Sequence, residues 1–249
     1  MVTALIFGAA IGLSLGVLGG GGSIITLPVL VYAAGVPATE AVGMSLAVVG
    51  TTSLVGGGLN LRRGLVHPKA AALFSSTGIV GALAGAQLTH LVSPAVLLLL
   101  FAALMIVIAS LMLLRSGKPR PKPGTVCQWP RCAATGLGVG ALTGFLGVGG
   151  GFLIVPAMVI FGRLATKTAI GTSLLVIAVN SFAGLAAHLQ QTSFNWRVAG
   201  MFTAVALAGM LVGTQFAARV SGERLNRWFA WFVLAVAAFV VARNWAALF

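Results

Sequence analysis

Acidic side chains are almost absent from this chain of 249 residues. It has two Asp and Glu residues against 15 Lys and Arg residues, a formal net charge of +13, and only 7% of its residues are charged. Soluble domains average roughly 25% charged residues, whereas this chain is 59% hydrophobic with a mean hydropathy of +1.09. The composition predicts a polytopic membrane protein and excludes a soluble enzyme, a disordered tail and a secreted disulfide scaffold.

The scarcity of carboxylates also narrows the function. Glu40 and Glu223 fall at the ends of apolar blocks. Cation transporters and proton relays place carboxylates within the membrane, and intramembrane hydrolysis needs a set such as Ser–His, Asp–Asp or HExxH. Since the apolar blocks contain no such set, we expect neither an enzyme nor a cofactor.

Cysteine is equally scarce. Cys127 and Cys132 lie five positions apart, without a second pair or a nearby histidine to complete a tetrahedral metal site. We therefore expect two reduced thiols and no bound metal.

The positive charges lie between the apolar runs. This is the pattern of cytoplasmic loops whose Lys and Arg residues set membrane topology, so we expect no nucleic-acid partner. The stretch 115–131, rich in proline and cations, is predicted to be a cytoplasmic linker that also touches anionic lipid. The membrane expected is the cell membrane, inner or plasma.

The chain contains an internal duplication. With a shift of 128 residues the two halves align without a gap. Internal repeats in an apolar chain are typical of secondary transporters. The matched pairs include Gly8 with Gly136, Gly12 with Gly140, Gly16 with Gly144, Pro28 with Pro156, Gly43 with Gly171 and Ser45 with Ser173.

The alignment divides the chain into repeat 1 (1–114), the linker (115–131) and repeat 2 (132–249). Each repeat holds four apolar blocks, which are 2–36, 41–61, 70–92 and 94–114, and then 133–161, 168–189, 198–218 and 228–249. Six of these blocks are about 20 residues long, the length that a helix needs to cross a bilayer. The predicted fold is therefore all-α.

The first block of each repeat is longer and is interrupted by glycines, at 19–22 and at 147 and 149–151. A glycine inside a helix costs about 1 kcal/mol relative to alanine. We therefore predict that a second, short helix begins near Ser23 and near Phe152. Irregular backbone at membrane depth must be shielded by protein or line a wet cavity, so both breaks are expected to face inward.

These broken blocks could either cross the membrane or fold back as hairpins. Eight crossings would place ten Lys and Arg residues on one face and five on the other, whereas hairpins divide them thirteen to two. The second division fits the positive-inside rule better. We therefore expect inverted repeats, each a helical hairpin plus three spans, with both chain termini outside the cell.

The glycine breaks are the strongest candidates for a binding site. A helix that begins inside the membrane presents unpaired N–H groups and the positive end of its dipole, which attract an anion. Polar residues within the apolar spans could add hydroxyl and amide contacts. The candidate binding residues are Gly21, Gly22, Ser23, Gly149, Gly150, Gly151, Ser45, Ser173, Asn180, Gln87 and Gln215.

Other glycines recur every four residues, a spacing that produces a small-residue ridge for close helix packing. One such ridge lies at 8, 12 and 16, and its repeat lies at 136, 140 and 144. The ridge could pack within the chain or between the subunits of a homodimer.

Two segments resemble the TauE/SafE family of sulfite-exporter-like permeases: GVLGGGGSIITLPVLVYAAGVPATEAVGMSLAVV and GFLGVGGGFLIVPAMVIFGRLATKTAIGTSLLVI. The resemblance covers essentially the whole chain and implies transport of sulfite, sulfonates or related organic acids. Gly20 is matched by Val148, a departure between the repeats. The family pattern falls on Gly19, Gly21, Gly22, Pro28, Gly43 and Ser45, and on Gly147, Gly149, Gly150, Gly151, Pro156, Gly171 and Ser173.

The sequence thus predicts a secondary transporter whose substrate, a small anion, binds between two helix N-termini in mid-membrane. Two alternatives stay open. One is a transporter of a neutral solute or a metal ion, and the other is a non-transporting membrane subunit that scaffolds a partner enzyme. The lipid bilayer is an expected partner in every case.

Overall fold

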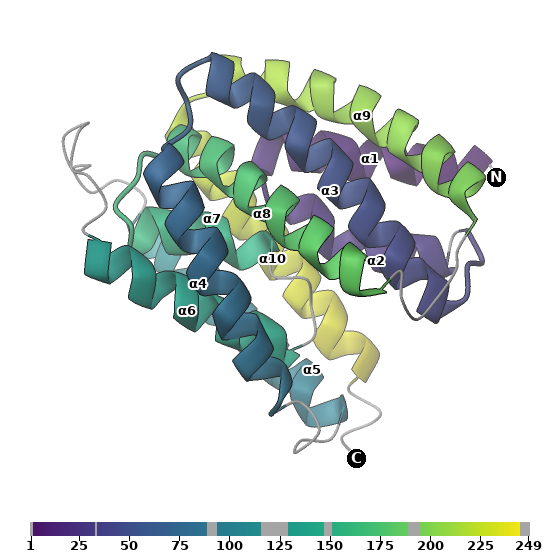
Figure 1. Ribbon diagram of the computed structural model, residues 1–249, viewed down its shortest axis with the longest axis horizontal. Helices are drawn as coiled ribbons and strands as arrows, with labels where there is room; N and C mark the ends of the chain where they lie inside the picture. Colours follow the sequence, from purple (N-terminus) through teal and green to yellow (C-terminus); the bar gives the residue numbers. More distant parts are fainter. Residues whose placement is uncertain are drawn as a thin grey trace.

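The computed structural model describes residues 2–32, 34–88, 94–115, 129–146, 151–188 and 195–244. These ranges form helices and contain no strand, so the predicted all-α fold is confirmed (Figure 1). Most of the predicted linker, 116–128, lies outside them. The helices are α1 (Val2–Leu18), α2 (Gly21–Tyr32), α3 (Ala38–Arg62), α4 (Pro68–Ala86), α5 (Pro94–Arg115), α6 (Trp129–Leu146), α7 (Gly151–Ile160), α8 (Thr166–His188), α9 (Trp196–Arg219) and α10 (Gly222–Asn244).

Several helices are long and apolar enough to cross a membrane. In the described part of the chain five qualify, within α3, α4, α8, α9 and α10, and α5 contributes a shorter apolar stretch, Leu99–Leu114. Large apolar side chains cover the outer surface, such as Val212 at 60% exposure and Phe239 at 65%. Since water would disfavour such a surface, the prediction of a polytopic membrane protein is confirmed.

Helix starts are fixed by local capping chemistry. The α4 helix begins with Pro68 at a position where the missing N–H costs nothing, and the His67 ring accepts a hydrogen bond from the Ala70 N–H at 3.2 Å. The α10 helix begins at Gly222, earlier than the predicted block at 228. Its first turn carries Glu223, an acidic residue that suits the positive end of a helix. Glu223 therefore belongs to the helix and not to a loop before it.

The glycine ridges pack helices from opposite ends of the sequence against each other. Gly12 lies so close to α9 that a Cβ would overlap the Ala206 carbonyl, and Gly16 would meet Met210 in the same way. Because residue numbers rise together on both helices, α1 and α9 run parallel. This close approach confirms the predicted small-residue packing and shows that the ridge is used within the chain.

The second ridge repeats this arrangement between α4 and α6. Gly140 lies against the backbone of Gly78, and Gly144 lies against that of Ala82, so these helices are also parallel. Figure 1 shows α1 with α9 on one side of the molecule and α4 with α6 on the other. Each ridge helix therefore packs on a helix of the other half of the chain.

In contrast, α3 and α8 cross in opposite directions. A Cβ on Gly50 would lie 3.2 Å from the Ser181 Cβ, whereas one on Gly57 would lie 2.9 Å from the Leu175 Cγ, so residue numbers fall on α8 as they rise on α3. These helices are equivalent blocks of the two halves. With eight full crossings each half would have four, and equivalent helices of the two halves would run in the same direction. With hairpins each half has three crossings, which inverts the second half, so the antiparallel packing of α3 and α8 favours the hairpins.

The hairpins themselves are visible. A Cβ on Gly22, at the start of α2, would lie 2.6 Å from the carbonyl oxygen of Ile11 in the middle of α1. Leu15 of α1 and Leu30 of α2 also belong to one buried cluster. The α2 helix therefore folds back along α1 and does not continue it.

The second hairpin follows the same course. Cys132, near the start of α6, shares a buried cluster with Met158, near the end of α7.

Cys132 is disulfide-bonded in the structure, so the expectation of free thiols is wrong.

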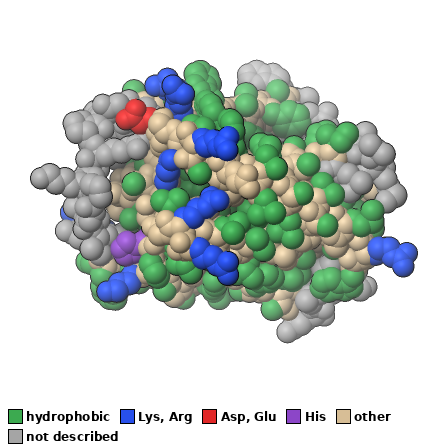
Figure 2. Space-filling model, turned by 90° about the horizontal axis from the view of Figure 1, so that it is seen from above, with side chains coloured by type: hydrophobic (Ala, Val, Ile, Leu, Met, Phe, Trp, Pro, Cys, Tyr) green, Lys and Arg blue, Asp and Glu red, His purple; other side chains and the backbone are tan. Residues whose placement is uncertain are grey.

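Positive side chains mark one end of the bundle. Figure 2 shows most of the visible Lys and Arg residues gathered over one half of a face that is otherwise largely hydrophobic. Arg63 and Lys167 contact backbone carbonyls in the last two turns of α9, the negative end of its dipole. Arg63 donates to the Thr214 carbonyl at 3.4 Å, and Lys167 donates to the Ala218 carbonyl at 2.9 Å.

Candidate functional site

The first helix break lies at two glycines. The α1 helix ends at Leu18 and α2 begins at Gly21, two residues before the predicted Ser23. Gly19 has a φ of +78°, a left-handed conformation that favours glycine. The predicted interruption is therefore confirmed, and its sharp turn depends on Gly19.

The second break separates α6, which ends at Leu146, from α7, which begins at Gly151. This start is one residue before the predicted Phe152, and residues 147–150, where the interruption is predicted, lie outside the described residues. Two of the candidate binding residues, Gly149 and Gly150, lie outside the described residues.

The two breaks contact each other. A Cβ on Gly20 would overlap the Gly151 carbonyl and lie 2.9 Å from the Phe152 Cα. A Cβ on Gly151 would lie 2.6 Å from the Ser23 Oγ. Ser23 and Gly151 are aligned positions in the sequence, so the starts of α2 and α7 meet at equivalent points.

This contact lies in the middle of the helix bundle. A Cβ on Gly151 would lie 3.2 Å from Ile177, which is the midpoint of the long helix α8. Gly21, Gly22 and Gly151 are all buried. The described glycines at the starts of α2 and α7 therefore face inward, as the sequence predicted from the cost of bare backbone in lipid.

Two helix N-termini meet at this junction, and the carboxyl end of α1, at Leu18, lies at the same break. The first-turn N–H groups of a helix lack helical partners, and its dipole places about half a positive charge at that end. The two acidic side chains lie elsewhere, in the first turns of α3 and α10. The arrangement suits a bound anion better than a cation.

Two serine hydroxyls lie at the junction. The Ser23 hydroxyl donates to the Gly20 carbonyl at 2.7 Å, and the Ser173 hydroxyl donates to the Ile170 carbonyl at 2.8 Å. Ser173 is fully buried, and its Oγ lies 3.0 Å from where a Cβ on Gly19 would be. Each hydroxyl can reach an anion only by rotating away from its own helix.

The other polar candidates occupy three different environments. Ser45 is half-buried on α3, and Asn180 is half-buried on α8, where it lines a cavity. Gln87, just after α4, and Gln215, on α9, are exposed. The structure therefore brings Ser23, Ser173 and the described glycines together and places both glutamines on the outer surface.

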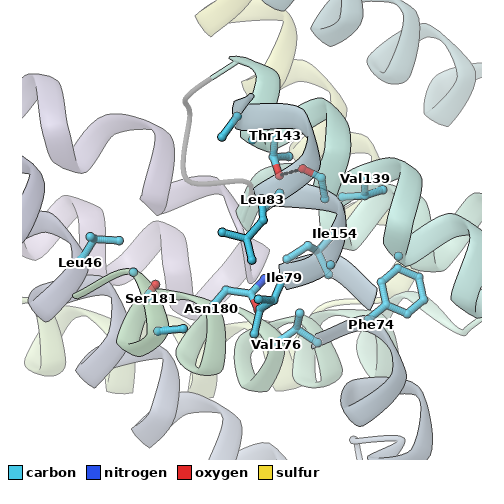
Figure 3. Close-up of a pocket in the computed structure, with 18 residues that line it drawn as sticks. Leu46, Phe74, Ile79, Leu83, Val139, Thr143, Ile154, Val176, Asn180 and Ser181 are labelled. Carbon is cyan, nitrogen blue, oxygen red and sulfur yellow. Dashed lines mark hydrogen bonds between the residues drawn. The ribbon is translucent and has the colours of Figure 1, made fainter. Parts of the chain in front are cut away.

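A cavity of about 540 Å³ opens beside the junction, between α4, α6 and α8. Its wall is mostly apolar, and Asn180 points into it together with Ile79, Leu83 and Val176 (Figure 3). Ile154 of α7 also lines it, one turn after Gly151. The cavity thus reaches the N-terminal turn of the second short helix.

Sequence reasoning missed two features. Ser53, fully buried on α3, has a hydroxyl oxygen without a hydrogen-bond partner among the described residues. Its only signal was a hydroxyl within an apolar span. The contacts of Arg63 and Lys167 with α9 were also missed, because sequence gives no sign of which helix end lies opposite a cation.

Comparisons with known proteins identify relatives along nearly the whole chain. The model of the family described as "Sulfite exporter TauE/SafE" matches residues 4–240. A "Probable membrane transporter protein" from Xylella fastidiosa (strain Temecula1) is 36% identical over 247 residues, which cover 97% of this chain and 95% of the relative. "Probable membrane transporter protein YdhB" from Bacillus subtilis is 28% identical over 220 residues, covering 87% and 86%.

Proposed function

The chain belongs to the TauE/SafE family of membrane transporters, and from this premise we propose that it carries a small anion, which binds where α2 and α7 begin. The contact between Gly20, Gly151 and Ser23 carries this proposal. It joins two helix N-termini in mid-bundle, and backbone N–H groups at such ends bind anions without any basic side chain.

The substrate we propose is sulfite, a sulfonate or a related organic acid. The family description names sulfite, and the buried junction contains glycines and serines without a carboxylate that would repel an anion. A neutral solute would gain little from two converging dipoles. A metal ion would need ligands, and no group of three or more His, Cys, Asp or Glu residues occurs in the described part of the chain.

We further propose that the two halves are inverted repeats in the membrane, with the basic linker in the cytoplasm and both termini outside. Three pairs of helices have first residues that lie 128 positions apart, the same shift that aligns the glycines: α3 and α8, α4 and α9, and α5 and α10. Antiparallel α3 and α8 support the inversion, because a parallel duplication would orient them alike.

Flux measurements in liposomes test the proposed function. The purified protein is reconstituted, and uptake of labelled sulfite and of labelled methanesulfonate is compared with uptake of a neutral sugar and of Ni²⁺. Transport of at least one anion, with neither the sugar nor the metal carried, is the expected result. Transport of the sugar or the metal alone would overturn the proposal.

A glycine substitution locates the site. We expect Gly151→Ala to reduce anion flux at least tenfold, because its methyl group meets Ser23 Oγ at 2.6 Å. Gly138→Ala in α6 is the matched control, since a Cβ there has nothing within 4 Å. Normal flux in correctly inserted Gly151→Ala protein would show that the anion does not pass this junction.

A further inference from the structure

The cavity between α4, α6 and α8 is large and apolar for a protein that would carry only an inorganic anion. Its volume is about 540 Å³, and sites for organic ligands span roughly 300–1,000 Å³. A water molecule occupies about 30 Å³ of liquid, and sulfite, with four heavy atoms, is only a few times larger. An apolar wall would also remove the hydration of such an ion without replacing it.

One polar group in this wall lacks a partner. The Oδ1 atom of Asn180 is buried and has no hydrogen-bond partner among the described residues. Figure 3 shows the Asn180 side chain directed from α8 into the cavity. An unpaired buried acceptor costs about 1–3 kcal/mol. Because the Oδ1 atom itself is buried, the amide must rotate by a half-turn to bring it to the cavity surface, where a donor from a ligand would relieve this cost.

The cavity lies between helices of both halves, and the equivalent space on the other side of the molecule, between α9, α1 and α3, has bulkier residues. At the positions that the 128-residue shift aligns with two lining residues, Met210 stands in place of Ala82 and Leu15 in place of Thr143. Met210 and Leu15 are fully buried, and a Cβ on Gly56 would lie 3.1 Å from the Met210 sulfur. Small residues therefore keep open on one side a space that larger residues fill on the other.

The position of the cavity connects it to the junction of the short helices. Ile154 lies one turn into α7, and Val176 precedes Ile177, the neighbour of Gly151. A molecule with its anionic end at the N-terminus of α7 could therefore extend its remaining atoms between α4, α6 and α8.

We infer that this cavity binds the carbon body of an organic anion, with an apolar group the size of an aromatic ring and a hydrogen-bond donor that reaches Asn180. This inference rests on the proposed function and narrows its substrate class. The anionic end is held at the junction, and burial of the apolar body supplies selectivity over inorganic oxyanions.

Binding measurements on the purified full-length protein test the inference. The probes are sulfite, methanesulfonate, benzenesulfonate and 4-hydroxybenzenesulfonate, measured by calorimetry in one detergent. Benzenesulfonate should bind at least tenfold more tightly than methanesulfonate, because its ring fills the cavity. The added hydroxyl should strengthen binding about threefold or more through Asn180.

Three variants assign these gains to the cavity. Ala82→Met introduces the residue found at the aligned position and should remove the preference for benzenesulfonate, while methanesulfonate binding stays the same. Ala84→Met, on the exposed face of the same helix, should leave both affinities unchanged. Asn180→Leu should remove only the gain from the hydroxyl group.

The outcomes separate this inference from the function on which it rests. Equal affinities for methanesulfonate and benzenesulfonate, or a preference that survives Ala82→Met, would overturn the inference and leave anion transport intact. Binding of neutral phenol as tight as that of 4-hydroxybenzenesulfonate would identify the space as a lipid or detergent site and would also overturn it. Failure of every anion to bind would count against the proposed function itself.

Discussion

A single methyl group at Gly20 should disrupt the junction between the two halves. In Gly20→Ala the Cβ would overlap the Gly151 carbonyl and lie 2.7 Å from the carbonyl carbon of the same residue. These are backbone atoms, which cannot rotate away as a side chain can. Overpacking of this kind costs about 1–3 kcal/mol, and part of it would be spent on separating α2 from α7.

The matched variant is Gly58→Ala in α3. A Cβ there has nothing within 4 Å, so alanine should stabilise this helix by about 0.5–1 kcal/mol. For a protein of this size 1 kcal/mol corresponds to roughly 2–4 °C in melting temperature. Gly20→Ala should therefore melt about 2–12 °C below the parent protein, and Gly58→Ala should melt at or slightly above it.

Thermal unfolding in detergent and anion flux in liposomes measure the two consequences separately. We expect Gly20→Ala to lose most of its flux even at temperatures where it stays folded, whereas Gly58→Ala keeps full flux. Parental stability and parental flux in Gly20→Ala would refute the close contact of the two breaks, and with it the shared anion site.

Three further predictions follow from other parts of the structure. Ser53→Ala removes a hydroxyl oxygen that has no partner in the described residues, so its unfolding free energy should stay within about 1 kcal/mol of the parent; a loss above about 2 kcal/mol would reveal an unseen partner. Arg63→Gln and Lys167→Gln should each cost about 0.3–1 kcal/mol by removing a cation from the carbonyl end of α9, and unchanged melting of the double variant would contradict those contacts. A reporter fused after Phe249 should be active only outside the cell, and cytoplasmic activity would contradict the inverted arrangement.

The sequence was most informative where the physical signal is local. Consecutive glycines penalise a continuous helix wherever they occur, so the breaks could be located within two residues of Gly21 and Gly151. Ridges of small residues could be recognised in the same way. Neither signal identifies a partner, and the packing of Gly12 on α9 follows from tertiary structure alone.

Polar residues were harder to place for a related reason. Asn180, Gln87 and Gln215 all interrupt apolar blocks, yet only Asn180 lines the cavity. An amide near the end of a helix can reach the polar interface at low cost, so its presence says little about burial. The cavity depends on Ala82 and Thr143 from two separate helices, and no local pattern reveals such a space.

The packing of each ridge helix on a helix of the other half has a consequence for biosynthesis. The α1 helix leaves the ribosome well before α9, yet its glycines pack against Ala206 and its neighbours in α9. At about 5–20 residues per second, translation of the intervening chain takes roughly 10–40 s. During that time the glycine face of α1 has no packing partner in the bilayer. Protection of this face by the insertion machinery would therefore matter most before α9 is inserted.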